Sequence, residues 1–187
     1  IEAVRRHETA PTASAALGRM LTGAALLGAS LKEFDRLTVR IDADGPVGGI
    51  IVESNNLGHV RGYVRNPTAE VPPKPDGKFD VSGIVGGGMF HVLRESGFEL
   101  GLHREPYIGS VPITSGEIAE DFAFYLAKSE QIPSAVMLGV LLQNTEPFVT
   151  ASGGVMIQMM PGVNDHIVTM IEDTVAHAPH LTSVIKE

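Results

Sequence analysis

The sequence predicts an α+β fold in which mixed, mainly antiparallel sheets pack with helices in a single core domain. Short apolar–polar alternations separated by turn residues run from 37 to 112, as expected of antiparallel strands. Two stretches, 11–30 and a helix beginning at Thr114, instead show apolar residues at helical spacing. No repeat or change in composition divides the 187 residues, and a chain of this length buries a sizeable core.

The first predicted helix covers residues 11–30. Thr12 or Ser14 is expected to cap it, because a hydroxyl oxygen can accept a bond from a free backbone N–H. Leu17 and Leu21 recur at helical spacing. Alanine and glycine make up most of the remaining positions, so neighbouring elements are expected to approach this helix closely.

A three-stranded antiparallel meander is predicted over residues 37–65. The stretch LTVRID alternates apolar and polar residues, and Asp44-Gly45 is a strong turn signal before the second strand. The run from Asn55 to Gly58 makes the next turn, because Asn and Gly tolerate positive φ. Residues 66–78 contain four prolines and no periodicity, which predicts a loop.

Three further short strands are expected at DVSGIV, MFHVLRE and PYIGSVPI. The glycines at 86–88 lie between the first two. Glycine-rich runs can cradle a phosphate, but SGIVGGGM lacks the lysine and hydroxyl residue of a P-loop and the spacing of a dinucleotide fingerprint. We therefore interpret it as a hairpin turn.

The second helix is predicted to begin with a capping box formed by Thr114 and Glu117. Pro133 prevents it from running on. Its apolar stripe consists of Ile118, Phe122, Tyr125 and Leu126.

The C-terminal part is predicted as two paired strands and a helix. AVMLGVLL is an apolar strand, and FVTASGGVMIQMMP is its partner, in which Gly153-Gly154 marks a bulge or a close backbone contact. The last helix begins near Asn164 or Asp165 and ends by Ala178-Pro179. Its apolar stripe is Ile167, Val168, Ile171 and Val175.

The charge and hydropathy patterns exclude two classes of partner. The formal net charge is −8; residues 66–187 carry six basic and fifteen acidic side chains, against eight and seven in residues 1–65. Such a surface repels phosphate backbones, so no nucleic-acid partner is expected. The longest apolar stretch, 15–31, is interrupted by Gly18, Arg19 and Thr22, so no membrane-spanning segment is expected either.

Reactive constellations are weak throughout the chain. There is no cysteine, which excludes disulfides, thiol nucleophiles and thiolate zinc sites here and fits a reducing compartment. His177 and His180 are separated by a helix-breaking proline, so no metal site is predicted. The cluster Glu117, Glu120 and Asp121 could serve acid–base or Mg²⁺ chemistry, although complementing a helix dipole is the simpler interpretation.

Methionines are concentrated in one stretch near the C-terminus. Met156, Met159 and Met160 flank Ile157, and alternation places Met156 and Met160 on the face opposite Ile157 and Met159. Methionine is flexible and polarizable, which suits both core filling and promiscuous binding surfaces. The sequence leaves these two interpretations open.

Several stretches, taken together and in order, resemble the thirty-three-kilodalton heat-shock protein family, a family of redox-regulated bacterial holdase chaperones. They span nearly the whole chain: PTASAALGRMLTGAALLGASLK, GPVGGIIVESNNLGHVRGYVRNP, DVSGIVG, EPYIGSVPITSGEIAEDFAFYLAKSEQIPSAVMLGVLL and ASGGVMIQMMPG. None is a catalytic signature, and the specificity lies in the ordered set.

The resemblance implies a core domain over residues 1–187 that holds unfolding proteins without ATP, acts as a homodimer in the cytoplasm and is not an enzyme. The family also has a C-terminal module with four cysteines that bind zinc, joined by a linker. We expect that module, most of the linker and the extreme N-terminal strands to lie outside this chain. Zinc binding and redox sensing therefore map onto no residue here.

Client contacts are expected near the C-terminal end, where a linker would pack and later uncover apolar surface. We assign them to Met156, Met160, Ile167, Met170 and Ile171. We expect no catalytic residue, no metal ligand and no cofactor within the chain. The alternatives are a small-molecule enzyme that uses the glycine-rich loops with Glu117, Glu120 and Asp121, and a passive assembly domain.

Overall fold

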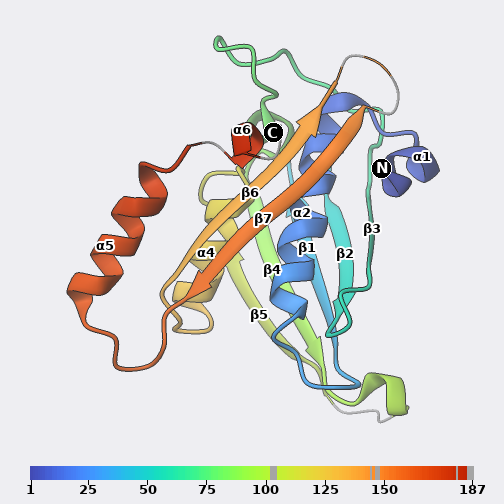
Figure 1. The fold of residues 1–187 in the computed structure, drawn as a ribbon. Coiled ribbons are helices and arrows are strands. Elements are labelled where there is room, and N and C mark those ends of the chain that lie inside the picture. Colours follow the sequence, from blue (N-terminus) through green and yellow to red (C-terminus); the bar gives the residue numbers. More distant parts are fainter. Residues whose placement is uncertain (102–104, 144, 146–147, 180, 185–187) are drawn as a thin grey trace.

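The structure is a computed structural model that describes residues 1–101, 105–143, 145, 148–179 and 181–184. It contains a five-stranded sheet of order β3-β2-β1-β4-β5 and a two-stranded sheet of β6 and β7, and every pairing is antiparallel (Figure 1). The predicted α+β class is confirmed. The strands are β1 (Arg36–Ala43), β2 (Ile50–Asn55), β3 (Val60–Val64), β4 (Gly88–Glu95), β5 (Tyr107–Pro112), β6 (Ser134–Leu142) and β7 (Val149–Gln158). The helices are α1 (Glu2–His7), α2 (Pro11–Gly28), α3 (Val81–Val85), α4 (Ala119–Lys128), α5 (Asp165–Ala176) and α6 (Leu181–Val184), with a 3₁₀ turn at Phe98–Leu100.

Helix α2 lies between the two sheets and contacts strands of both (Figure 1). Two glycines allow this close approach to the sheets. A Cβ atom on Gly18 would lie 2.7 Å from a methyl carbon of Val140 in β6, and one on Gly28 would lie 2.3 Å from the Ser54 hydroxyl in β2. The expectation that small residues let neighbours approach this helix is confirmed.

The core centres on aromatic side chains between the large sheet and α4. All four residues of the predicted apolar stripe are fully buried, including Phe122 and Tyr125. The ring of Phe90 in β4 lies 4.9 Å from that of Phe122, edge-on, and 5.8 Å from that of Tyr125. Edge-to-face rings at such spacing add to the free energy gained by burial alone.

The start of α2 differs from the prediction. Its N-cap is Ala10, which has no side-chain acceptor, and Ser14 is buried with its hydroxyl bonded to Thr9. Thr12 donates its backbone N–H and its hydroxyl to the carboxylate of Glu70, in the proline-rich loop. A carboxylate supplied from far along the chain therefore replaces the predicted local cap, and its negative charge complements the helix N-terminus.

The predicted strand DVSGIV is instead the short helix α3. Asp80 caps it by accepting bonds from the backbone N–H of Gly83 at 2.9 Å and the hydroxyl of Ser82 at 2.8 Å. A capping side chain at the first position favours helix over strand. The glycines that follow join α3 to β4, so they do not form the predicted hairpin turn.

Helix α4 begins at Ala119, five residues after the predicted cap at Thr114. Ile118 has a φ of 68°, which interrupts any earlier helical turn. The buried carboxylate of Asp121 accepts backbone N–H bonds from Thr114, Ser115 and Ile118 at 2.8–3.1 Å. The capping box of Thr114 with Glu117 was therefore wrong, and Asp121 organises the turn that precedes the helix.

The C-terminal elements follow the prediction more closely. β6 and β7 pair as expected, but Gly153 and Gly154 are in regular register, and the irregularity lies at Leu141 and Leu142. A Cβ atom on Gly154 would lie 2.7 Å from Leu138, which confirms the close contact rather than the bulge. Helix α5 is capped by Asn164, as predicted, and ends at Ala176.

We expect the substitution Phe122→Ala to lower the free energy of unfolding by about 3–5 kcal/mol, because it empties a fully buried site beside Phe90. Phe98→Ala is the control. Its ring is 41% exposed and lies against the Arg36 guanidinium, so the loss should stay at about 1 kcal/mol. Urea unfolding measures both; equal losses would contradict this assignment of the core.

Candidate functional site

The C-terminal part of the chain exposes large apolar side chains on successive elements. Met160 lies just beyond the end of β7 and is 74% exposed, while Ile167 and Met170 of α5 are 43% and 53% exposed. Figure 1 shows α5 standing beside the two-stranded sheet and away from α2. This region is the candidate functional surface, and we call Met160, Ile167 and Met170 the exposed apolar set.

Local sequence explains why α5 presents these side chains. Asn164 accepts the backbone N–H of His166 at 2.9 Å, which starts the helix. Ile167 and Met170 are three residues apart and therefore lie on one side of the helix. The partly buried residues Val168, Ile171 and Val175 follow the predicted stripe, and α5 contacts β6.

The five sequence-predicted contact residues fall into two groups. Met160, Ile167 and Met170 are exposed, whereas Met156 and Ile171 are partly buried, and Met156 packs against the core. The alternation that paired Met156 with Met160 stops at the end of the strand. Met159 is only 8% exposed and donates its backbone N–H to the carbonyl of Pro133, outside the β6–β7 ladder.

Two residues of the acidic cluster, Glu117 and Asp121, make contacts that stabilise the fold. Glu117 accepts bonds from Arg19 of α2 at 2.6 Å and from Lys74 of the proline-rich loop at 2.5 Å. Burial raises the pKa of Glu117, but the hydrogen bonds from Lys74 and Arg19 outweigh it and hold the pKa below its usual value. Asp121 is buried and bonded to backbone N–H groups, and Glu120 is exposed. These three carboxylates do not converge on a common catalytic or Mg²⁺ position.

The glycine-rich run makes no phosphate cradle either. Asp44 accepts the backbone N–H of Gly87 at 2.7 Å, and a Cβ atom on Gly86 would lie 2.6 Å from the same carboxylate. Asp44 therefore already occupies the position that an anion would take above these glycines. An anionic side chain at that place would repel a phosphate.

Within the described residues, no group of three or more His, Cys, Asp or Glu side chains could hold a metal ion. The Nδ1 atom of His177 lies 2.7 Å from the carbonyl oxygen of Asp173, and His180 lies outside the described residues. The chain has no cysteine, so its residues do not fit the four-thiolate zinc centre that the resemblance implies.

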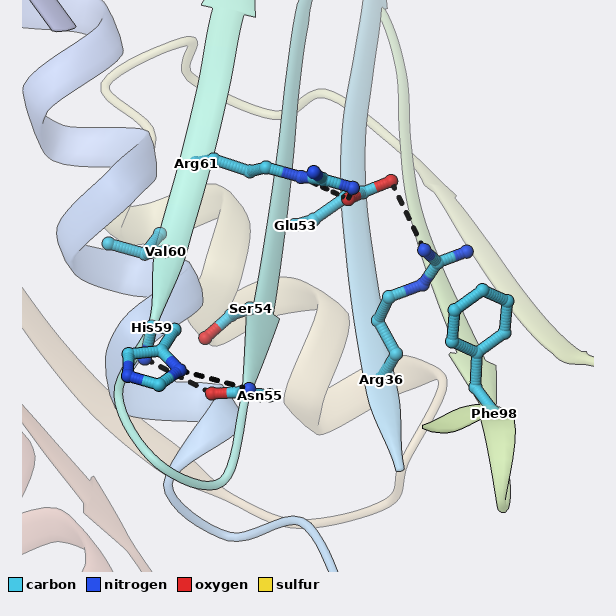
Figure 2. Close-up of a pocket in the computed structure, with 8 residues that line it drawn as sticks. All are labelled: Arg36, Glu53, Ser54, Asn55, His59, Val60, Arg61 and Phe98. Carbon is cyan, nitrogen blue, oxygen red and sulfur yellow. Dashed lines mark hydrogen bonds and ion pairs between the residues drawn. The ribbon is translucent and has the colours of Figure 1, made fainter. Parts of the chain in front are cut away.

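Sequence reasoning missed a pocket of about 370 Å³ at one end of the large sheet (Figure 2). Arg36 lies between two carboxylates there, with N–O distances of 2.8 Å to Glu95 and 3.8 Å to Glu53, and the Phe98 ring covers its guanidinium at 3.4 Å. The eight lining residues are Arg36, Glu53, Ser54, Asn55, His59, Val60, Arg61 and Phe98.

The charges of this pocket are largely paired with one another. Arg61 is 2.5 Å from the Glu53 carboxylate, so Glu53 bridges two arginines (Figure 2). The pairing of Arg36 with Glu95 depends on the register of β1 and β4, which sets these two residues opposite each other. We interpret these ion pairs of Arg36 and Arg61 with Glu53 and Glu95 as joining neighbouring strands at this end of the sheet, not as a reactive site.

The chain is similar in sequence and in fold to known proteins. Residues 1–187 match the family described as Hsp33 protein. The chain is 48% identical over 185 residues to the "33 kDa chaperonin" of Desulforamulus reducens and 48% identical over 190 residues to that of Thermus thermophilus. The crystal structure of the 33 kDa chaperonin, a heat shock protein 33 homolog, from Thermotoga maritima superposes with a TM-score of 0.89 at 40% identity.

The chain thus has the fold of a 33 kDa chaperonin, exposes several large apolar side chains, and uses carboxylates for contacts within the fold. The chain belongs to the Hsp33 family. The matches include 99–100% of this chain but only part of each relative. They span 61% of the Desulforamulus protein, 53% of the Thermus protein and 62% of the Thermotoga chain. Among the described helices, none has the length and apolar character needed to cross a membrane.

We expect Glu117→Gln to lower the free energy of unfolding by about 1–2 kcal/mol at pH 7, because two cations lose their carboxylate partner. The folded chain holds the pKa of Glu117 below its ordinary value of 4.5, so this contribution is present above that value. It is lost as the pH falls through the lowered folded pKa, and the gap between variant and parent should close there.

Urea unfolding from pH 7 to pH 3 measures this gap. Glu120→Gln is the matched control, because Glu120 is exposed in the first turn of α4, three residues after Glu117, and should change stability little at any pH. A gap for Glu117→Gln that stays constant down to pH 3 would show that the ion pairs with Arg19 and Lys74 do not carry the effect.

Proposed function

We propose that this chain is the core of a redox-regulated, ATP-independent holdase chaperone, which binds unfolding proteins through apolar surface and keeps them from aggregating. The observation that carries the proposal is the match of the whole chain to relatives named 33 kDa chaperonin. The geometry supports it, because Glu117 and the glycine-rich run make their polar contacts within the fold.

The client-facing surface is proposed to be the exposed apolar set, with Met156 and Ile171 at its margin. Apolar contact is non-directional, so one surface can hold many unrelated sequences. Methionine side chains adapt to different partners at low cost because they are unbranched and polarizable. Met160 and Met170 combine this flexibility with high exposure, so they are the strongest candidates.

The remaining features of the proposal rest on the resemblance and on charge. The zinc centre and the redox response belong to a cysteine-bearing module outside residues 1–187. The working form is proposed to be a cytoplasmic homodimer without enzymatic activity. Neither nucleic acid nor membrane is proposed as a partner, since the chain carries a formal charge of −8.

Heat-denatured citrate synthase, followed by light scattering, tests the activity of this chain directly. We expect the chain to reduce scattering at a few-fold molar excess without added ATP. Hydrogen peroxide should not increase this effect, because the chain has no thiol to oxidise, and oxidation of the exposed methionines to polar sulfoxides should only weaken it. An equal mass of serum albumin serves as the control for crowding.

A full-length relative, oxidised and warmed, is tested in parallel. Failure of the oxidised relative to suppress scattering would remove the basis of the proposal. Strong activation of the cysteine-free chain by peroxide would contradict the placement of the redox response outside it.

The client surface is tested by serine substitutions. Met160→Ser and Met170→Ser should weaken suppression of scattering while unfolding stability stays within about 0.5 kcal/mol, because both side chains are exposed. Met156→Ser is the contrasting variant: its side chain packs against the core, so it should lose stability by about 1–3 kcal/mol. Unchanged suppression by the double variant of Met160 and Met170 would exclude this surface.

A further inference from the structure

Strand β5 forms one margin of the five-stranded sheet and pairs only with β4 (Figure 1). The backbone N–H of Ile113 donates to the carbonyl of Gly88 at 2.9 Å, which fixes the phase of the ladder. Hydrogen-bonded pairs alternate with non-bonded pairs in an antiparallel ladder. Tyr107, Gly109 and Val111 therefore bond to β4, whereas Ile108 and Ser110 direct their N–H and C=O groups away from it.

This outward row of backbone groups is left open by the part of the chain that the structure describes. No described residue bonds to the backbone N–H or C=O of Ile108 or Ser110; the Ser110 hydroxyl bonds to Nδ1 of His91 at 2.7 Å, across to β4. β5 contains no charged residue, and its single proline, Pro112, stands at its last position. Sheet edges in native proteins are usually blunted by charge, proline or a covering element.

Apolar side chains are exposed on both faces of this edge. A Cβ atom on Gly109 would lie 2.8 Å from the Tyr125 ring, so the odd-numbered positions of β5 face α4. Tyr107, on that face, is 51% exposed, and Ile108, on the opposite face, is 57% exposed. A partner docked on one face of the sheet would cover only one of them. A strand added along the edge would cover both.

The opposite edge of the sheet, β3, is protected by an exposed charge and by a covering helix. β3 carries Arg61, whose side chain is 78% exposed, and helix α1 contacts this strand. A ring contact of 6.3 Å joins His7 of α1 to Tyr63 of β3. The two edge strands of the sheet therefore differ in protection, and β5 is the one suited to accept another strand.

We propose that β5 binds an extended, uncharged apolar segment of an unfolding polypeptide as a sixth strand of the sheet. This rests on the proposed function and assigns a second mode of client contact. Backbone bonds do not depend on client sequence, and an unfolding chain offers extended segments with unsatisfied N–H and C=O groups. The open edge is only one short strand long, whereas a stable dimer buries roughly 1,200–2,000 Å². Transient client binding suits its size better than permanent pairing with a second copy.

Amide hydrogen exchange of this chain, measured by NMR, tests the proposal residue by residue. The probe is reduced, carboxymethylated α-lactalbumin, which stays unfolded. At saturation we expect exchange of the Ile108 and Ser110 amides to slow by about tenfold or more, because they gain hydrogen-bond partners. The amides of Gly109 and Val111 should change little, since they already bond to β4.

A matched pair of substitutions isolates the backbone group. Ser110→Pro and Ser110→Ala both remove the hydroxyl bond to His91, but only proline removes the outward N–H. We expect Ser110→Pro to weaken binding of the probe about tenfold and Ser110→Ala to leave it within about twofold. Ile108→Lys keeps every backbone group and adds a charge at the edge. It should also weaken binding, and it serves if the proline variant fails to fold.

The outcomes separate this inference from the proposed function. Suppressed client aggregation with unchanged exchange at Ile108 and Ser110 overturns the strand pairing and leaves the chaperone proposal standing. Slowed exchange at these amides without the probe, growing with the concentration of the chain, shows that a second copy is the occupant and also overturns it. Equal effects of Ser110→Pro and Ser110→Ala would show that the backbone donor plays no part.

Discussion

The close approach of α2 to its neighbours is the constraint on which the rest of the structure depends. Gly18 allows β6 to pack against the helix, Gly23 makes room for the ring of Phe122, and Gly28 does the same for Ser54 of β2. Because these glycines lie on different sides of one helix, the large sheet, α4 and the small sheet share a single core. Any side chain at these positions would push a whole layer outward, and closely packed interiors tolerate such shifts poorly.

The same packing decides where polar groups can act. Asp121 is buried and organises the turn before α4, while Glu117 joins Arg19 to Lys74 across three separate segments. These carboxylates lie close together in sequence like a catalytic cluster, but in the structure their oxygens accept bonds from other groups of the fold. For apolar contact with partners, the fold leaves the exposed apolar set near α5 and the open edge at β5. A protein that holds many unrelated sequences needs such undemanding contacts.

Periodicity predicted the elements well and their beginnings poorly. The meander, the stripe around Phe122 and the pairing of β6 with β7 follow from local patterns that burial enforces. The start of α4 could not be predicted, because it depends on the positive φ of Ile118 and on Asp121 reaching back to Thr114. DVSGIV has strand-like composition, yet the cap at Asp80 turns it into a helix. The ladder of Arg36 with Glu53 and Glu95 requires strand register, which a single sequence does not contain.

The capping of α2 by Glu70 links two events in the formation of the molecule. The carboxylate lies 58 residues along the chain from Thr12, beyond the whole three-stranded meander. During synthesis the helix emerges before Glu70, and its first turn lacks this carboxylate cap until that meander and the loop after it have been made. The N-terminal turn of α2 is thus completed only after Glu70 has been synthesised, by a contact that closes a long loop of the chain.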